Sequence, residues 1–157
     1  MKINLLGKST KIQKQIYTQH AKTIIKKIEN RIPQICRALN IILVDNCYIK
    51  RLNKQFLNRN YATDVLAFPL CEKMTAKISR NKEKNKNLRK SDIDSTSKKS
   101  DILWGEIYIS YEQARKQARF QKITTDQEIC HLIAHGILHL AGYSHHQMQK
   151  ILNSLPK

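Results

Sequence analysis

Three histidines near the C-terminus have the type and spacing that can hold a metal ion. His135 and His139 are four residues apart, so on a helix they share one face and can present their imidazoles to the same ion. Gly142 can then end the helix in the left-handed conformation that glycine tolerates, which lets His145 supply a third nitrogen. Three nitrogen ligands with an open fourth position are typical of catalytic zinc sites, whereas structural sites are closed and usually rich in sulfur. The sequence therefore predicts a metal site suited to catalysis.

The same histidines match the zinc-protease pattern H-E-x-x-H-x-x-G-x-x-H, except at one position. Gly136 stands where those proteases carry the glutamate that activates water as a general base. Peptide hydrolysis on this template requires that carboxylate, so the sequence argues against a zinc peptidase. A histidine pair on an apolar helix can also be plain core packing, but the third histidine behind a glycine turn favours a metal site. His131, four residues before His135, is expected to be a core histidine.

The chain carries a large positive charge. Its 157 residues include 29 Lys and Arg against 12 Asp and Glu, a formal net charge of +17. This length suits one domain with its own core, so residues 1–157 are predicted to form a single domain. The charge favours a polyanionic partner, most simply nucleic acid, because each neutralised phosphate releases a counterion. An acidic membrane surface and a merely solvated basic face are the alternatives.

The cysteines and the apolar runs indicate a cellular compartment. Four cysteines are scattered without a C-x-x-C pair, which argues against a zinc ribbon or a thioredoxin-like redox motif: Cys36, Cys47, Cys71 and Cys130. The apolar run at the N-terminus is too short for a signal peptide, and no segment has the length needed to span a bilayer. We therefore expect a cytoplasmic protein with reduced thiols and no membrane partner.

Hydrophobic periodicity predicts helices packed on a small sheet in two or three layers. Strands are expected at residues 2–6, 40–45, 63–68 and 103–109. Helices are expected at 11–39 with a break at Pro33, at 46–56 capped by Asn46, from Ser110 with Gln113, from Thr125 with Glu128, and at 146–155. The helix from Thr125 would carry the histidines.

Residues 71–101 differ in composition from the rest of the chain. They are rich in Lys, Asn, Ser and Arg, contain few large apolar residues and show no period. Such a segment cannot bury enough apolar surface to offset the entropy lost on ordering, so we expect a flexible basic insertion. It could act as a basic arm for nucleic acid, although a solvated loop is the simpler expectation.

With these motifs in place, the chain resembles the YbeY family of bacterial rRNA maturation factors. The family string is H-G-x-L-H-L-x-G-Y-D-H, and residues 135–145 match all but one of its fixed positions. Residues 63–69, T-D-V-L-A-F-P, resemble its T-D-V-L-S-F-P segment, and residues 105–110, G-E-I-Y-I-S, resemble its G-D-I-x-I-S strand. Gln117 stands at the matching place in the next helix. The resemblance covers most of residues 40–153.

The resemblance implies an α+β fold with a small mixed four-stranded sheet, about five helices and a zinc-binding helix that lines a cleft. It implies a metal-dependent endoribonuclease that cleaves single-stranded RNA in 16S rRNA 3′-end maturation and ribosome quality control. The implied partners are single-stranded RNA, rRNA and the small ribosomal subunit. The implied cofactor is one Zn²⁺ per chain, with His135, His139 and His145 as its ligands. Zinc in such a site would lower the pKa of a water molecule to about 7 and polarise a phosphoryl oxygen.

Two positions depart from the family pattern. Ser144 replaces an aspartate before the last ligand, although serine can still form local hydrogen bonds. Leu57 replaces an arginine that is expected to face the cleft and help with phosphate. Arg59, two residues further on, is our candidate to stabilise the phosphate instead. These departures leave open the alternative of a zinc-stabilised, ribosome-associated RNA-binding factor with weak or no catalysis.

Overall fold

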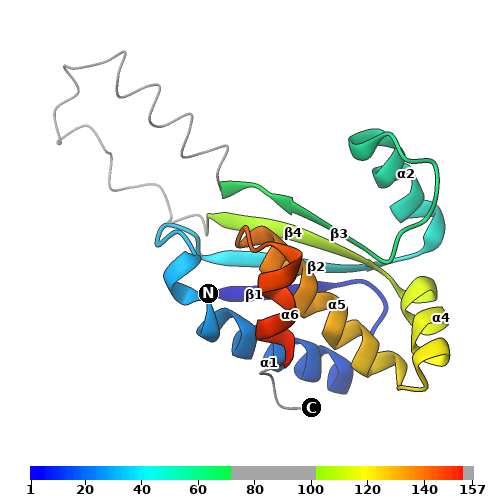
Figure 1. The fold of residues 1–157 in the computed structure, drawn as a ribbon, viewed down its shortest axis with the longest axis horizontal. Helices are drawn as coiled ribbons and strands as arrows, with labels where there is room; N and C mark the ends of the chain where they lie inside the picture. The colour runs from blue at the N-terminus through cyan, green and yellow to red at the C-terminus, as the bar shows by residue number, and fades with distance from the viewer. Residues whose placement is uncertain (72–101, 154–157) are drawn as a thin grey trace, which may run out of the picture.

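The computed structural model describes residues 1–71 and 102–153 (Figure 1). Apart from Cys71, the expected basic insertion at 71–101 lies outside these residues. In chain order the elements are β1 (Lys2–Leu6), α1 (Lys11–Lys27), a 3₁₀ turn (Glu29–Arg31), β2 (Ala38–Val44), α2 (Asn46–Leu57), β3 (Val65–Pro69), β4 (Leu103–Ser110), α4 (Tyr111–Gln121), α5 (Thr125–Leu140) and α6 (His145–Asn153).

The strands form one mixed sheet in the order β1-β2-β4-β3. The pairs β1–β2 and β2–β4 are parallel, whereas β3 runs antiparallel to β4. Helices α1, α5 and α6 lie along one side of this sheet, and α2 lies on the other side near one end (Figure 1). The part of the chain that the structure describes therefore has a mixed four-stranded sheet and five α-helices, which confirms the α+β prediction. No helix in that part is long and apolar enough to cross a membrane.

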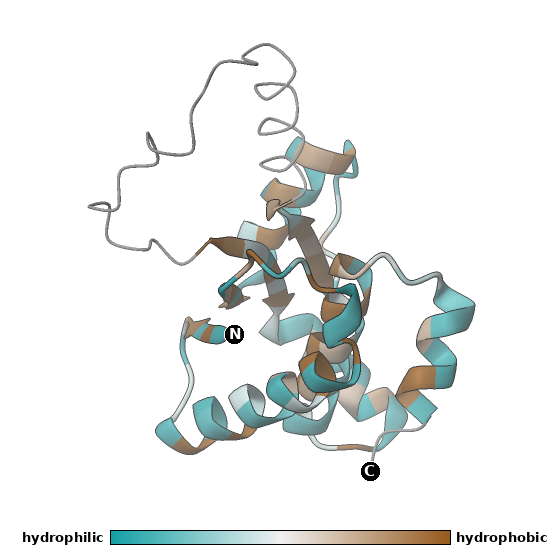
Figure 2. Ribbon diagram, turned by 90° about the vertical axis from the view of Figure 1, so that its left-hand side faces the viewer, coloured by the Kyte–Doolittle hydropathy of each residue, from teal (hydrophilic) through white to brown (hydrophobic). Residues whose placement is uncertain are grey.

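The core lies between the sheet and the helices α1 and α5. Alternate residues of β2 are buried, as expected for a strand that turns one face to a core: Leu39, Ile41 and Leu43. On the neighbouring strand β4, Ile107 and Ile109 lie in register with Ile41 and Leu43 and are fully buried. Figure 2 shows the strands mainly in the hydrophobic colour. The four predicted strands are all present, with β2 beginning two residues earlier than expected.

Helix α5 packs very closely on the sheet at two glycines. A Cβ atom added to Gly136 would lie 2.7 Å from Cγ2 of Ile107, so this face of the helix has no space for a side chain. Near the end of the helix, a Cβ atom on Gly105 of β4 would lie 2.9 Å from Cδ2 of Leu140. These two contacts fix the height and the rotation of α5 over the sheet, because packed interiors leave few voids.

Two helices are capped one residue earlier than the sequence predicted. The side chain of Asp45, not Asn46, caps α2 by accepting a hydrogen bond from the Tyr48 amide at 2.7 Å. Thr124, not Thr125, caps α5, since its hydroxyl and the side chain of Gln127 form a reciprocal capping box. In both places two adjacent residues are suitable caps, so composition alone could not decide between them.

The long helix expected at residues 11–39 is also shorter in the structure. Helix α1 ends at Lys27, a 3₁₀ turn follows, and the last residues of the predicted helix belong to β2. Pro33 lies between the turn and the strand, where its ring and missing amide hydrogen stop helical hydrogen bonding. By contrast, the predicted cap at Ser110 is confirmed, because its hydroxyl accepts from the Gln113 amide at 3.2 Å.

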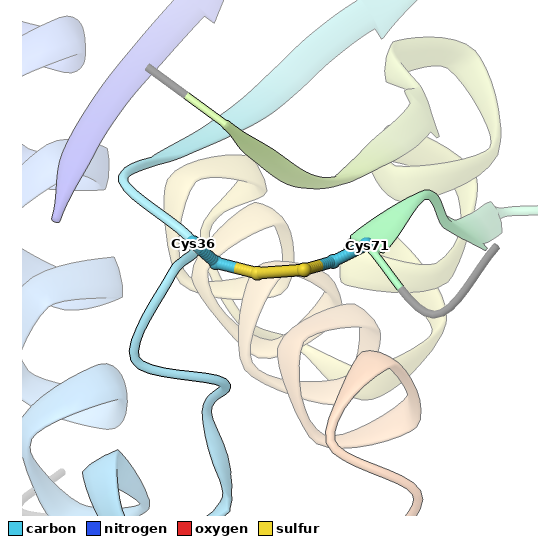
Figure 3. Close-up of a disulfide and its surroundings, with 2 residues drawn as sticks. All are labelled: Cys36 and Cys71. Carbon is cyan, nitrogen blue, oxygen red and sulfur yellow. A yellow bond between two sulfur atoms is a disulfide. The ribbon is translucent and has the colours of Figure 1, made fainter. Parts of the chain in front are cut away.

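The expectation of reduced thiols is wrong for two of the four cysteines. Cys36 and Cys71 form a disulfide with 6.7 Å between their Cα atoms, although 35 residues separate them (Figure 3). Cys36 precedes β2 and Cys71 follows β3. Because β3 runs antiparallel to β4, and β4 runs parallel to β2, the last residues of β3 and the first residues of β2 lie at the same end of the sheet. The pairing depends on strand order, so no local spacing could reveal it. Cys47 and Cys130 are free thiols.

We predict that Gly136→Ala destabilises the protein by about 1 kcal/mol. The overpacked methyl group costs about 1–3 kcal/mol against Ile107, and the gain of about 1 kcal/mol in helix propensity offsets part of that cost. Urea unfolding of Gly136→Ala, Ile107→Ala and the double variant measures the coupling energy between the two positions. The two changes should be less than additive, because the smaller side chain makes room for the methyl group. Strictly additive changes in the free energy of unfolding would show that there is no steric coupling between positions 136 and 107.

Candidate metal centre and adjoining cleft

The three histidines predicted as ligands lie together at the end of α5 and the start of α6. The Nε2 atoms of His135 and His139 are 3.0 Å apart. Ligand nitrogens of these two residues and of His145 all lie within 4.8 Å of one another, so the group could hold a metal ion. Zinc–nitrogen bonds of about 2.0–2.1 Å in a tetrahedron place the nitrogens about 3.3 Å apart, close to the spacing of the first pair.

A tight turn after α5 returns the chain toward the first two histidines. Gly142 adopts a φ of +73°, the left-handed region that the sequence predicted for it. Its amide donates to the His139 carbonyl at 3.0 Å, and the Tyr143 amide donates to the Leu138 carbonyl at 3.1 Å. These two bonds are those of a Schellman motif, which satisfies the last carbonyls of the helix. The guanidinium of Arg31 lies over the Tyr143 ring, 4.3 Å from its centre.

Ser144 supplies the start of the next helix. Its amide donates to Oε1 of Gln147 at 3.1 Å, and its carbonyl accepts from the Met148 amide at 2.9 Å. Helix α6 therefore begins at His145, one residue earlier than the predicted start at His146. The third candidate ligand thus occupies the first position of a helix, where the turn and the cap fix its backbone. Both bonds are made by the backbone of Ser144 and do not depend on its hydroxyl.

The environment of the histidines favours their neutral form. Burial, followed by the neighbouring histidines, lowers the pKa of His135 below the ordinary value of 6.5. Burial and the proximity of His145 lower the pKa of His139 as well. A neutral imidazole has a free lone pair for a metal, whereas a protonated one does not. His139 and His145 are exposed to solvent, so the group keeps an accessible side. The donor set therefore fits a zinc ion with an open position.

Two of the family-like segments meet beside the histidines. Gln117 donates from Nε2 to Oδ2 of Asp64 at 3.0 Å, which joins α4 to the chain before β3. Thr63 and the Val65 amide donate to the other carboxylate oxygen at 3.0 and 2.8 Å. Burial by itself would raise the pKa of Asp64, but these hydrogen bonds outweigh it and lower the pKa. The carboxylate is therefore ionised and held in place.

A cleft of about 610 Å³ adjoins His135 and His145 and extends between α4, α5 and α6. His131 lines it with a side chain that is 50% exposed, so the prediction of a core histidine is wrong. Glu128 also lines the cleft, whereas the sequence analysis assigned it to the helix cap that Gln127 forms in the structure. It lies seven residues before His135, a spacing that returns to the same helix face and could have indicated its position.

Arg59 lies apart from this cleft. It follows α2, its amide donates to the Asn53 carbonyl at 3.2 Å, and its side chain is exposed. Neither Arg59 nor Leu57 is among the described residues that line the cleft. Gly136 lies on the side of α5 that faces the sheet, where a glutamate would collide with Ile107. The zinc-protease base therefore has no counterpart at this position.

Comparisons with known proteins agree with the motifs. A family model described as Endoribonuclease YbeY matches residues 2–153. An Endoribonuclease YbeY from Clostridium botulinum strain 657 is 33% identical over 107 residues, which are 68% of this chain and 62% of that protein. The protein of the same name from strain Eklund 17B is 27% identical over 130 residues, 82% of this chain and 76% of its own. The chain thus spans less than two thirds of the length of the first relative.

The fold also has a counterpart among solved structures. A Thermotoga maritima protein whose structure was determined in solution superposes with a TM-score of 0.52. The two chains are 25% identical, and the match covers 96% of this chain and 87% of that one. The likeness therefore extends over both the sheet and the helices that position the histidines.

We predict that the histidine cluster makes the metal-free protein sensitive to mild acid. The folded-state pKa of His135 and of His139 lies below 6.5, so below that pH the unfolded chain binds more protons than the folded one. The contribution of these two histidines to the free energy of unfolding is fully present above about pH 6.5 and is lost as the pH falls below that value. Urea unfolding between pH 8 and 5 should show a steeper loss in the parent than in His135→Gln/His139→Gln. Equal slopes would contradict the pKa shifts.

Proposed function

Because the chain belongs to the YbeY family, we propose that it is a metal-dependent endoribonuclease that cleaves single-stranded RNA. One observation carries the proposal: three imidazoles lie within 4.8 Å of one another at the end of a cleft and form an open, all-nitrogen donor set. Such a set suits hydrolysis better than a purely structural role. The relatives named Endoribonuclease YbeY support the same reaction.

The proposed biological setting follows from the family and the charge. We assign the protein to 16S rRNA 3′-end maturation and ribosome quality control in the cytoplasm. Its partners would be single-stranded rRNA and the small ribosomal subunit. A net charge of +17 supports a polyanionic partner, since basic side chains gain affinity by releasing counterions from phosphates.

In the proposed mechanism His135, His139 and His145 hold one zinc ion. When bound, zinc supplies an activated water molecule and an electrophile for a phosphoryl oxygen. Burial and neighbouring histidines favour the neutral form of His135 and His139, and the chain leaves the outer side of the group open to a phosphodiester. Gly136 provides no carboxylate base, so the nucleophile would be water activated by a bound ion or the 2′-hydroxyl of the RNA. Arg59 remains our candidate to stabilise phosphate charge from outside the cleft.

We predict that purified protein cleaves a labelled single-stranded RNA and that His139→Ala reduces the rate at least a hundredfold. Loss of one of three ligands should remove the bound ion, and a chelator should have the same effect on the parent. His146→Ala is the matched control, because this neighbouring histidine lies outside the ligand group and should leave cleavage unchanged.

Equal cleavage by the parent and His139→Ala would contradict the proposed centre and indicate a contaminating nuclease. Tight RNA binding by a zinc-loaded parent that cleaves nothing would instead support the ribosome-associated binding factor. The arginine absent at Leu57 favours that second function, so Leu57→Arg is the first variant in which to look for restored cleavage.

We predict that Arg59→Ala weakens binding to single-stranded RNA through the loss of one phosphate contact. The slope of log K against log salt should become shallower by about 0.7, the value for one contact with a single strand. Fluorescence anisotropy at several salt concentrations measures both slopes. Arg37→Ala, another exposed arginine, should keep the parent slope. An unchanged slope in Arg59→Ala would remove this residue from the binding surface.

A further inference from the structure

The cleft beside the histidines has a chemistry unlike that of the rest of this basic chain. Its titratable lining groups are the carboxyls of Asp64 and Glu128 and the imidazoles of His131, His135 and His145. No lysine or arginine is among the described residues that line it. A phosphate would meet carboxylates there and no permanent cation to balance its charge. The cleft therefore suits a part of the RNA that is uncharged.

Glu128 is an unusual group in the wall of this cleft. Its side chain is 2% exposed, and its Oε2 atom has no hydrogen-bond partner. The nearest cationic candidate is Nδ1 of His131 at 3.9 Å, which is beyond hydrogen-bonding distance. Buried polar atoms are almost always paired, because leaving one unpaired is costly. Asp64, by contrast, already accepts hydrogen bonds at both of its oxygens. Glu128 is thus the acceptor that lacks a donor.

The remaining lining residues suit a flat heterocycle with polar edges. Three side-chain amides can both donate and accept hydrogen bonds: Gln117, Gln121 and Gln149. The apolar lining includes Leu132, Met148 and the ring of Phe120, which is 90% exposed. Unpaired RNA bases are bound in this way, with their faces against aromatic or apolar side chains and their edges hydrogen-bonded. A volume of about 610 Å³ lies within the range of small-ligand sites.

The distance between Glu128 and the histidines allows one RNA strand to contact both. Seven residues of helix separate Glu128 from His135, about 10 Å along the axis. Glu128 is therefore too far away to bind the same ion. A strand whose phosphate lies at the three histidines can place an adjacent base in the cleft.

We propose that the cleft beside His135 binds an unpaired nucleobase with an exocyclic amino group, and that Glu128 accepts a hydrogen bond from that amino group. This inference rests on the proposed ribonuclease function and names the substrate feature that the site selects. Carboxylates accept from the N4 amine of cytosine, whereas uracil presents a carbonyl oxygen at the same place. The two pyrimidines therefore provide the sharpest comparison for Glu128.

The test is the binding of labelled oligo(C) and oligo(U) of equal length to the full chain, measured by anisotropy with a chelator present to prevent cleavage. The parent should bind oligo(C) about tenfold more tightly than oligo(U). Glu128→Leu should lower this ratio to near one, because leucine offers no acceptor, and Glu128→Gln should keep part of it through the amide oxygen. Glu29→Leu, which makes the same substitution outside the cleft, should keep the parent ratio.

Thermal melting distinguishes this role from a structural one. Glu128→Leu should melt at or above the parent temperature, because it removes an unpaired buried oxygen. Equal binding of the two oligomers by the parent, or an unchanged ratio in folded Glu128→Leu, would overturn the inference. Selective binding without cleavage in the presence of zinc would overturn the proposed function and leave the base site intact. Cleavage without selective binding would overturn the base site and leave the proposed function intact.

Discussion

The close contact between helix α5 and the sheet determines where the chemistry of this protein can lie. Gly136 rests on Ile107 and Leu140 rests on Gly105, so rotation of the helix about its axis would cause collisions, and separation from the sheet would lose these packing contacts. Once this rotation is fixed, the histidines at 135 and 139 lie on the flank of the helix. The same rotation places Glu128 in the wall of the cleft. The glycine that excludes a protease-type glutamate is thus the residue that orients the metal-binding face.

What the sequence could predict was local in origin. The proximity of the histidines follows from helical spacing and a glycine turn, which operate over a few residues. What it could not predict depended on tertiary topology. The disulfide between Cys36 and Cys71 requires the strand order, and the exposure of His131 requires knowing which flank of α5 meets α6. The cap at Asp45 in place of Asn46 is a smaller error, because both side chains can serve that purpose.

The site combines two kinds of recognition along helix α5 and its neighbours α4 and α6. The C-terminal turn of α5 and the start of α6 gather three imidazoles, which suit a metal and, through it, a phosphodiester. Two turns earlier α5 places the buried carboxyl of Glu128 beside side-chain amides and apolar groups of α4 and α6, and this lining suits a base. In the proposed function, positive charge elsewhere on the chain would attract the RNA backbone in general, whereas the cleft would provide selectivity. This division lets a strongly basic protein contain an acidic pocket beside its proposed reaction centre.

The most direct test of the proposed centre is X-ray absorption spectroscopy at the zinc edge on protein loaded with one equivalent of zinc. We expect nitrogen or oxygen scatterers at about 2.0 Å together with the multiple scattering of three imidazoles, and no sulfur. Such a spectrum would place the ion on His135, His139 and His145 without reference to activity. Sulfur at about 2.3 Å, or fewer than three imidazoles, would contradict the assignment and place the ion on other ligands.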